Sequence, residues 1–168
     1  MSTTAAHATL AIYLRDHHAA GRAGVALARR AADGVGLEAP LRQELGVVAE
    51  AIAEDLVSLE EIMAQLGVDA SRAKDTLASL GERMGRLKSN GRLRQRSPLS
   101  DVIELEALVA GIAAKEALWW SLSLSAALAE ADDGPDLERL IERARHQTGV
   151  VERCRREAAR VAFRDLGR

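Results

Sequence analysis

Apolar residues recur three and four positions apart over long stretches of this chain, which is the spacing that places side chains on one face of an α-helix. The clearest stretch carries Leu41, Leu45, Val48, Ile52, Asp55, Leu59, Ile62 and Leu66 in one such series. No stretch shows the alternation of apolar and polar residues that a half-buried strand requires. The pattern predicts an all-α fold.

Alanine supports this prediction, because it accounts for 32 of the 168 residues while Phe, Tyr and Trp together number four. Small side chains favour helix and let neighbouring helices approach closely. The length suits one domain and is enough to bury a core without disulfides or metals. We therefore expect a single domain over residues 1–168, with a core of Leu, Ala and Val between helices.

Turn residues mark where the helices start and stop. Gly34 follows an apolar series and suits the left-handed position after a helix, Gly67 ends the next series, and Pro40 and Pro98 suit a first turn. The sequence predicts four long helices and one shorter helix between the second and third long ones. The long helices are expected at residues 4–32, 40–66, 98–131 and 135–163, and the short helix at 71–88.

The loop lengths predict how these helices run. Short loops make the first two and the last two long helices antiparallel hairpins. The short helix would span roughly 27 Å, enough to carry the chain back along most of a bundle. That would leave the second and third long helices parallel, with a crossover connection between them. A simple up-and-down bundle with a fifth packed helix is the alternative.

Polar residues on the apolar faces nominate a site. His17 and Asp55 lie equally far from the loop near residue 36, so an antiparallel hairpin places them at one height. If the second and third long helices are parallel, Asp55 is matched by residue 115 or 116, and Glu116 is the candidate there. Reflection through the last turn leads to about residue 150, with Thr148 facing and His146 within the error. The candidate metal ligands are His17, Asp55, Glu116 and His146.

Such groups need partners, because burying an unpaired carboxylate costs several kcal/mol. One interpretation is a site for a single iron, manganese or zinc ion, which a mixed imidazole and carboxylate set suits. The preferred interpretation is a hydrogen-bonded network that fixes helix register. In a third, at least one of the residues faces water. No cofactor is required by the preferred interpretation.

The residues beside this candidate site also lead to expectations about packing. Asp16 and His18 flank His17 on the helix and are expected to reach water or an interface. Gly21 and Gly24 favour a close helix approach over room for a ligand beside His17. Adjacent Trp119 and Trp120 cannot both face one core, so one is expected to contact a partner chain or the short helix.

Composition excludes several classes of protein. The single Cys154 rules out an internal disulfide and Cys-based zinc motifs, which fits a cytoplasmic location, and no signal-peptide pattern opens the chain. The apolar run 105–128 is interrupted by residues such as Lys115, so no membrane span is expected. A net charge of −2 argues against nucleic acid. The basic segment from Arg83 to Arg96 leaves nucleic-acid binding as a weaker hypothesis.

The chain resembles the ferritin-like superfamily, in particular uncharacterised bacterial ferritin-like proteins. The resemblance is carried by Tyr-Leu-Arg-Asp-His-His at 13–18 followed by Gly21 and Gly24, and by Ser-Pro-Leu-Ser at 97–100 followed by Glu-Leu-Glu at 104–106. It implies a four-helix bundle with a crossover. Ferritin-like di-iron proteins use a Glu from each of two helices and Glu-x-x-His from the other two. This sequence contains no Glu-x-x-His.

These observations predict a ferritin-like bundle without standard di-iron ligands, acting as a structural or interaction module and forming a homo-oligomer. The alternative is a metal-binding protein or oxidoreductase that uses His17, Asp55 and Glu116.

Overall fold

The computed structural model describes residues 3–34, 37–70, 98–125, 128 and 134–164. These residues form four long helices: α1 (Thr3–Ala32), α2 (Ala39–Gln65), α4 (Pro98–Ser123) and α6 (Leu137–Ala162). The described ranges contain no strand. The predicted all-α class is confirmed. The short helix expected at 71–88 lies outside the described residues.

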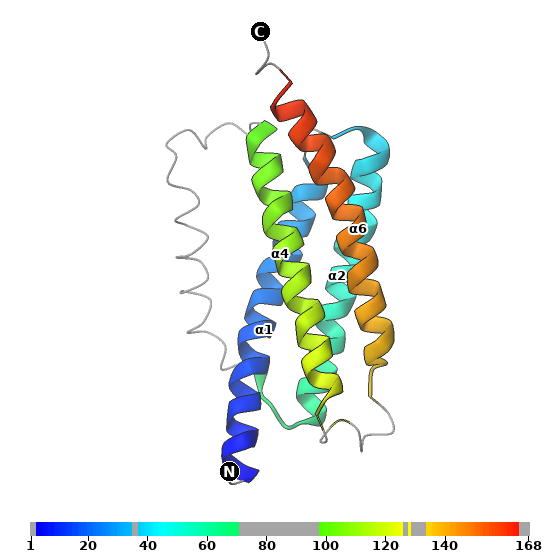
Figure 1. Cartoon of the computed structure of the whole chain (residues 1–168). Coiled ribbons are helices and arrows are strands. Elements are labelled where there is room, and N and C mark those ends of the chain that lie inside the picture. Colours follow the sequence, from blue (N-terminus) through cyan, green and yellow to red (C-terminus); the bar gives the residue numbers. More distant parts are fainter. Residues whose placement is uncertain (1–2, 35–36, 71–97, 126–127, 129–133, 165–168) are drawn as a thin grey trace, which may run out of the picture.

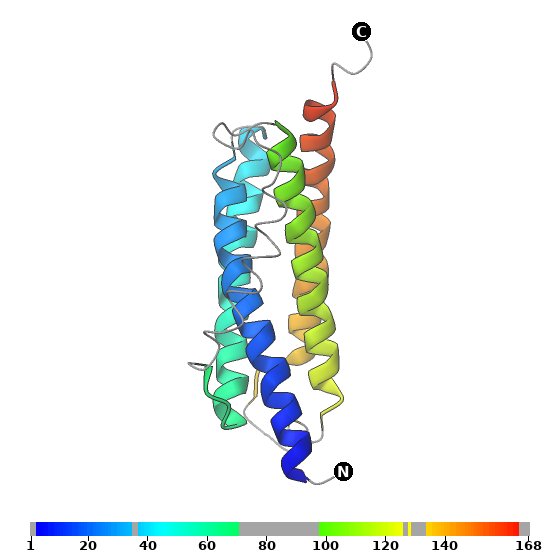
Figure 2. The same ribbon diagram turned by 90° about the vertical axis from the view of Figure 1, so that its left-hand side faces the viewer.

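The four helices form two packed hairpins, α1 with α2 and α4 with α6 (Figure 1). A view turned by 90° shows the same two layers side by side (Figure 2). Across the layers, α1 packs against α4 and α2 against α6. Figure 1 also shows that α2 and α4 run in the same direction, with the end of α2 at the opposite end of the bundle from the start of α4. The second and third long helices are therefore parallel.

Local chemistry sets the helix ends. Pro40 lies in the first turn of α2, and Gly67 after its last turn adopts a positive φ of 65°. Among the described glycines Gly67 alone has a positive φ, so the expected left-handed conformation of Gly34 is wrong. The side chain of Asp136 caps α6 by accepting a hydrogen bond from the Arg139 N–H at 3.0 Å. The expected starts of α2 and α6 are thus correct to within two residues.

The expected end of α4 near residue 131 is wrong, because the helix ends at Ser123. The Ser123 hydroxyl donates to the carbonyl of Trp120 at 2.8 Å, and the Ser125 N–H donates to the carbonyl of Leu122 at 2.9 Å. Both bonds reach three residues back, and serine side chains compete in this way with the helical pattern. The serine-rich segment therefore turns out of the helix early.

The core confirms the predicted faces of α2 and α6 but not that of α4. On α2 the series from Leu45 to Ile62 is buried, Asp55 included, and on α6 so are Ile141, Ala144 and Val151. On α4 the buried residues are Asp101, Val102, Leu105, Leu108, Ile112, Leu118, Trp119 and Leu122. The spacing of the sequence predicts a different inner face for α4: Leu99, Val102, Glu106, Val109, Ala113, Glu116, Trp120 and Ser123. Most of these residues lie on the opposite side. Apolar residues cover nearly all sides of α4, so their spacing does not define its buried face.

The outward face of α4 is unusual for an exposed helix surface. Its residues repeat at alternating steps of four and three and are all exposed. We call them, together with Leu124, the residue directly after the end of the helix, the outer stripe of α4: Leu99, Ile103, Glu106, Ala110, Ala113, Ala117, Trp120 and Leu124. Only one is charged, whereas the exposed face of α6 is mostly charged or polar. In the parts of the chain that the structure describes, no helix is long and apolar enough to cross a membrane.

Candidate functional site

Asp55 lies in the middle of α2 with only 1% of its surface exposed. Three polar side chains from the other hairpin surround its carboxylate. Lys115 reaches it from α4, and Arg143 and Gln147 reach it from α6. We call these four residues the Asp55 network.

The other three side chains contact the Asp55 carboxylate directly. The Lys115 ammonium donates to Asp55 Oδ2, and the Arg143 guanidinium forms an ion pair with Oδ1. The amide of Gln147 donates from Nε2 to Oδ2 at 2.9 Å, while its Oε1 accepts from Lys115. The buried amide therefore bridges an acid and a base, which fixes its orientation.

Two cations face one buried carboxylate, and a second acid at the edge of the network, Glu54, makes the number of negative charges equal to the number of positive charges. Glu54 Oε2 lies 3.0 Å from Arg143 Nη1, with the Glu54 side chain 70% exposed. Burial lowers the pKa of Lys115 below its usual value; attraction to Asp55 opposes this shift, and repulsion by Arg143 adds to it. The Asp55 network is of the kind that the preferred interpretation describes, but of the predicted residues it contains only Asp55. Asp55 Oδ1 and Arg143 Nε have no hydrogen-bond partner among the described residues, so at these atoms the ion pair compensates for burial.

The four predicted site residues do not come together. Asp55 is buried as expected, and His17 lies half-buried on α1. Glu116 instead points to the surface, where its Oε1 lies 2.8 Å from Arg145 Nε, and His146 is exposed. The reason is the orientation of α4, which turns Lys115 toward the core in place of Glu116. No group of three His, Cys, Asp or Glu side chains suited to a metal occurs within the described ranges. Metal binding stays a prediction.

His18 also differs from expectation. It is 5% exposed rather than outward-facing, and its Nε2 lies 2.8 Å from Glu60 Oε1 on α2. His17 packs edge-on against the ring of Tyr13, with ring centroids 4.5 Å apart. Asp16 is exposed, as predicted. The buried face of α1 is thus wide enough to include both histidines.

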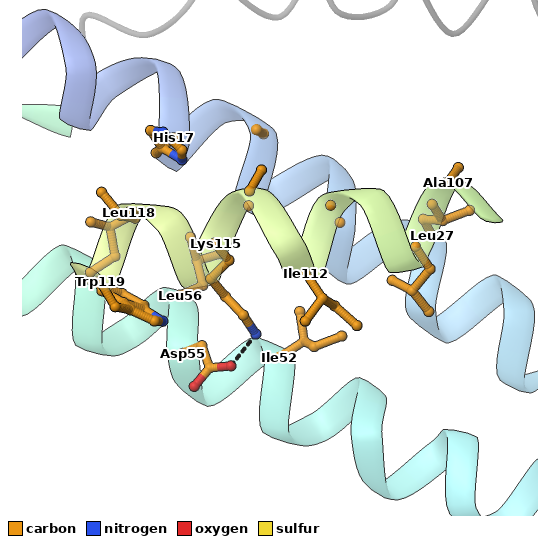
Figure 3. Close-up of a pocket in the computed structure, with 17 residues that line it drawn as sticks. His17, Leu27, Ile52, Asp55, Leu56, Ala107, Ile112, Lys115, Leu118 and Trp119 are labelled. Carbon is orange, nitrogen blue, oxygen red and sulfur yellow. Dashed lines mark hydrogen bonds and ion pairs between the residues drawn. The ribbon is translucent and has the colours of Figure 1, made fainter. Parts of the chain in front are cut away.

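A cavity of about 110 Å³ lies between α1, α2 and α4 (Figure 3). Its walls are mainly aliphatic and small, and its polar lining comes from His17, Asp55, Lys115 and Trp119. The other lining residues include Ala20, Gly21, Gly24, Leu27, Ile52, Leu56, Leu59, Ala107, Gly111, Ile112 and Ala114. Lys115 and Asp55 therefore take part in both the network and the cavity wall.

The two glycines of α1 have different roles in this wall. A Cβ added at Gly21 would lie 3.0 Å from Leu56 Cδ1, so close packing explains that glycine. A Cβ added at Gly24 would meet nothing within 4 Å. The prediction of close packing is therefore wrong for Gly24, where the alternative of open space holds.

His17 is expected to make stability depend on pH. Burial lowers its pKa from 6.5, and the charge of Asp16 only partly opposes this. The unfolded chain therefore takes up a proton before the folded protein does, so the free energy of unfolding should fall as pH drops through and below 6.5. We expect His17→Gln to reduce the loss of stability between pH 7 and pH 5, measured by urea unfolding. The exposed His146→Gln is the control, and an equal effect of both variants would contradict the assignment.

Comparisons with protein-family models, with curated proteins and with solved structures find no match for this chain. A function must therefore be argued from the geometry of the molecule itself.

Proposed function

We propose that this protein is a non-catalytic helical-bundle module that works by self-association, with the outer stripe of α4 as the interface between two copies. The observation that carries the proposal is the exposure of that stripe. Leu99 is 49% exposed, Trp120 is 49% exposed and Leu124 is 85% exposed. Contiguous apolar surface of this kind marks interaction sites on folded proteins.

The spacing of the stripe favours a second helix of the same kind. Steps of four and three residues are the heptad pattern by which two helices pack along a seam. Large side chains lie at both ends of the stripe, and Ala110, Ala113 and Ala117 lie between them. In an antiparallel pair, Leu99 of one copy meets Leu124 of the other, and Ile103 meets Trp120. Small residues meet in the middle, where they allow close approach.

Charge also permits two copies to meet. The stripe contains one acid, Glu106, whose Oε1 lies 3.7 Å from Arg155 Nη1 of the same chain. At the edge of the stripe, Glu116 is paired with Arg145, which also lies over the Trp120 ring at 5.8 Å. A two-fold pair therefore brings together acids that already have basic partners. Two-fold pairing of one patch with itself is the commonest symmetry of protein oligomers.

The reactive groups of the chain argue for a non-catalytic role. The Asp55 carboxylate accepts two hydrogen bonds on Oδ2 and is ion-paired with Arg143 on Oδ1, and both cations disfavour its protonation, which argues against a role as a base. Burial raises the pKa of the Cys154 thiol to about 11, with the charge of Glu44 adding to the effect. A neutral, buried thiol is a poor nucleophile.

We also propose that the bundle is ferritin-like, and the helix directions support this. Two antiparallel hairpins with α2 parallel to α4 are the arrangement that a crossover bundle requires (Figure 1). The Asp55 network occupies the interior of the bundle, and in ferritin-like di-iron proteins the metal ligands project into that interior. We therefore propose a bundle of this kind in which a charge network takes the place of a di-iron centre.

Self-association is tested by the variant Ala113→Arg. Residue 113 lies near the centre of the stripe, so two copies would bring two arginines together in the interface. Arginine is a good helix former and would be solvated at this exposed position in the monomer, so the fold is expected to survive. We expect light scattering at tens of micromolar protein to give twice the chain mass of 18.0 kDa for the natural sequence and 18.0 kDa for the variant.

The matched control is Ala26→Arg, the same substitution at an exposed position of α1. It should leave the mass at that of a dimer. A natural protein that is monomeric under these conditions, or an Ala113→Arg variant that stays dimeric, would refute the outer stripe as a self-association surface.

A further inference from the structure

One end of the cavity offers hydrogen-bond donors without a corresponding acceptor. Trp119 is completely buried and lines the cavity, and its indole Nε1–H has no hydrogen-bond partner among the described residues. Figure 3 shows this nitrogen on the side of the ring that faces Asp55 and Lys115. Buried indole N–H groups normally find a partner, because leaving one unpaired costs free energy.

Lys115 adds a second donor at the same end. An ammonium group has three N–H donors, and the described residues take two of them, through Asp55 Oδ2 and Gln147 Oε1. Asp55 is the nearby acid: its Oδ2 already accepts from Lys115 and Gln147, and its Oδ1 forms an ion pair with Arg143. The indole N–H of Trp119, on a residue that lines the cavity, therefore has no acceptor among the described residues.

Apart from this polar end, the lining of the cavity is apolar. The whole cavity has a volume of about 110 Å³, somewhat less than the engineered cavity of about 150 Å³ that binds benzene. Gly24 and Gly111 line it, and a Cβ added at either would meet nothing within 4 Å. An occupant of this shape is a ring or a short branched chain.

We propose that this cavity is a binding site for a compact apolar molecule with one oxygen acceptor. The oxygen accepts hydrogen bonds from the indole N–H of Trp119 and from the remaining N–H of Lys115. The apolar body of the ligand lies between the glycine-lined parts of α1 and α4. The site is independent of the outer stripe of α4, because Trp119 and Lys115 lie on the inner side of the helix.

Tetrahydrofuran is a suitable probe, because it is a five-membered ring with an oxygen acceptor and no donor. Cyclopentane is the matched ring without oxygen. The chain has only two tryptophans, so its indole N–H signals in a proton–nitrogen NMR spectrum can be assigned with the variant Trp120→Phe at the exposed position. We expect tetrahydrofuran to shift the Trp119 signal downfield, with saturation in the millimolar range, while the Trp120 signal stays in place.

Two controls make the result specific. Cyclopentane should bind about five-fold more weakly and should not move the Trp119 proton downfield, because it cannot accept the hydrogen bond. Gly24→Leu should abolish the saturable shift by filling the cavity. Leucine is a better helix former than glycine, and the space beside Gly24 accepts its side chain, so this variant should remain folded.

Three results would overturn the proposal. The first is a Trp119 signal that does not saturate or that moves in parallel with the Trp120 signal, which would indicate a general solvent effect. The second is equal behaviour of tetrahydrofuran and cyclopentane, which would remove the acceptor from the recognition. The third is unchanged binding by a folded Gly24→Leu variant, which would place the probe elsewhere.

Discussion

Asp55→Ala is expected to lower the free energy of unfolding by about 3–5 kcal/mol. The substitution leaves Lys115 and Arg143 with their charges turned toward a buried site that no longer contains an anion. Gln147, which is 1% exposed, also loses the acceptor of its amide N–H. The cost comes from these unpaired groups more than from the lost attraction. For a chain of this size it corresponds to a fall in Tm of roughly 6–20 °C.

The neighbouring acid provides the control. Glu54 also pairs with Arg143, but its side chain is 70% exposed, so Glu54→Ala should change stability by about 1 kcal/mol or less. Urea unfolding of both variants at pH 7 measures the difference. Equal losses for the two variants would mean that burial of the Asp55 network contributes nothing particular to the fold.

Trp119→Ala is expected to cost a similar amount, about 3–5 kcal/mol, because it empties the space of the largest fully buried side chain. Trp120→Ala should cost about 1 kcal/mol or less. That indole is 49% exposed, and the Arg145 guanidinium lies over its ring at 5.8 Å in a cation–π contact. Adjacent residues of one type thus differ severalfold in their effect on stability.

Both tryptophan variants are best measured in the Ala113→Arg background, so that association through the outer stripe does not contribute. Urea denaturation followed by circular dichroism gives the free energy of unfolding. A loss for Trp120→Ala as large as that for Trp119→Ala would show that the face of α4 has been assigned wrongly.

The helices whose buried face could be predicted from the sequence are those with one apolar face and one charged face. On α2, apolar residues from Leu45 to Ile62 alternate with acids such as Glu50 and Glu54, so the buried face is defined and Asp55 is identified as a buried acid. On α6 the arginines and glutamates leave one apolar face, which is buried as expected. In these helices the position of polar residues carries the information.

On α4 that contrast is missing, which explains most of the errors at the site. Alanines, Ile103 and Trp120 make its outward side nearly as apolar as its inward side, so a helical pattern can be drawn along either. The spacing predicts the outward series as the buried face, and with it Glu116 in place of Lys115. The parallel alignment of α2 and α4 had already led to residue 115 or 116. A buried acid at that level needs a base, and this requirement favours Lys115 over a second acid.

Arg143 and Gln147 could not be found from spacing alone. Both lie on a helix rich in charged residues, where one more arginine or glutamine at the edge of the apolar face is ordinary. Their role depends on which side chains they meet across the bundle. That information is tertiary and is not contained in the periodicity of a single helix.

The Asp55 network is divided unequally between the two hairpins, since one brings the acid and the other brings both bases and the amide. Two α1–α2 hairpins placed face to face would set carboxylate against carboxylate. Two α4–α6 hairpins would confine four cations in one interior. The buried charges therefore favour packing of an α1–α2 hairpin against an α4–α6 hairpin and disfavour packing of two like hairpins. In a bundle rich in alanine, where many helix pairs could pack, this difference prevents incorrect pairing.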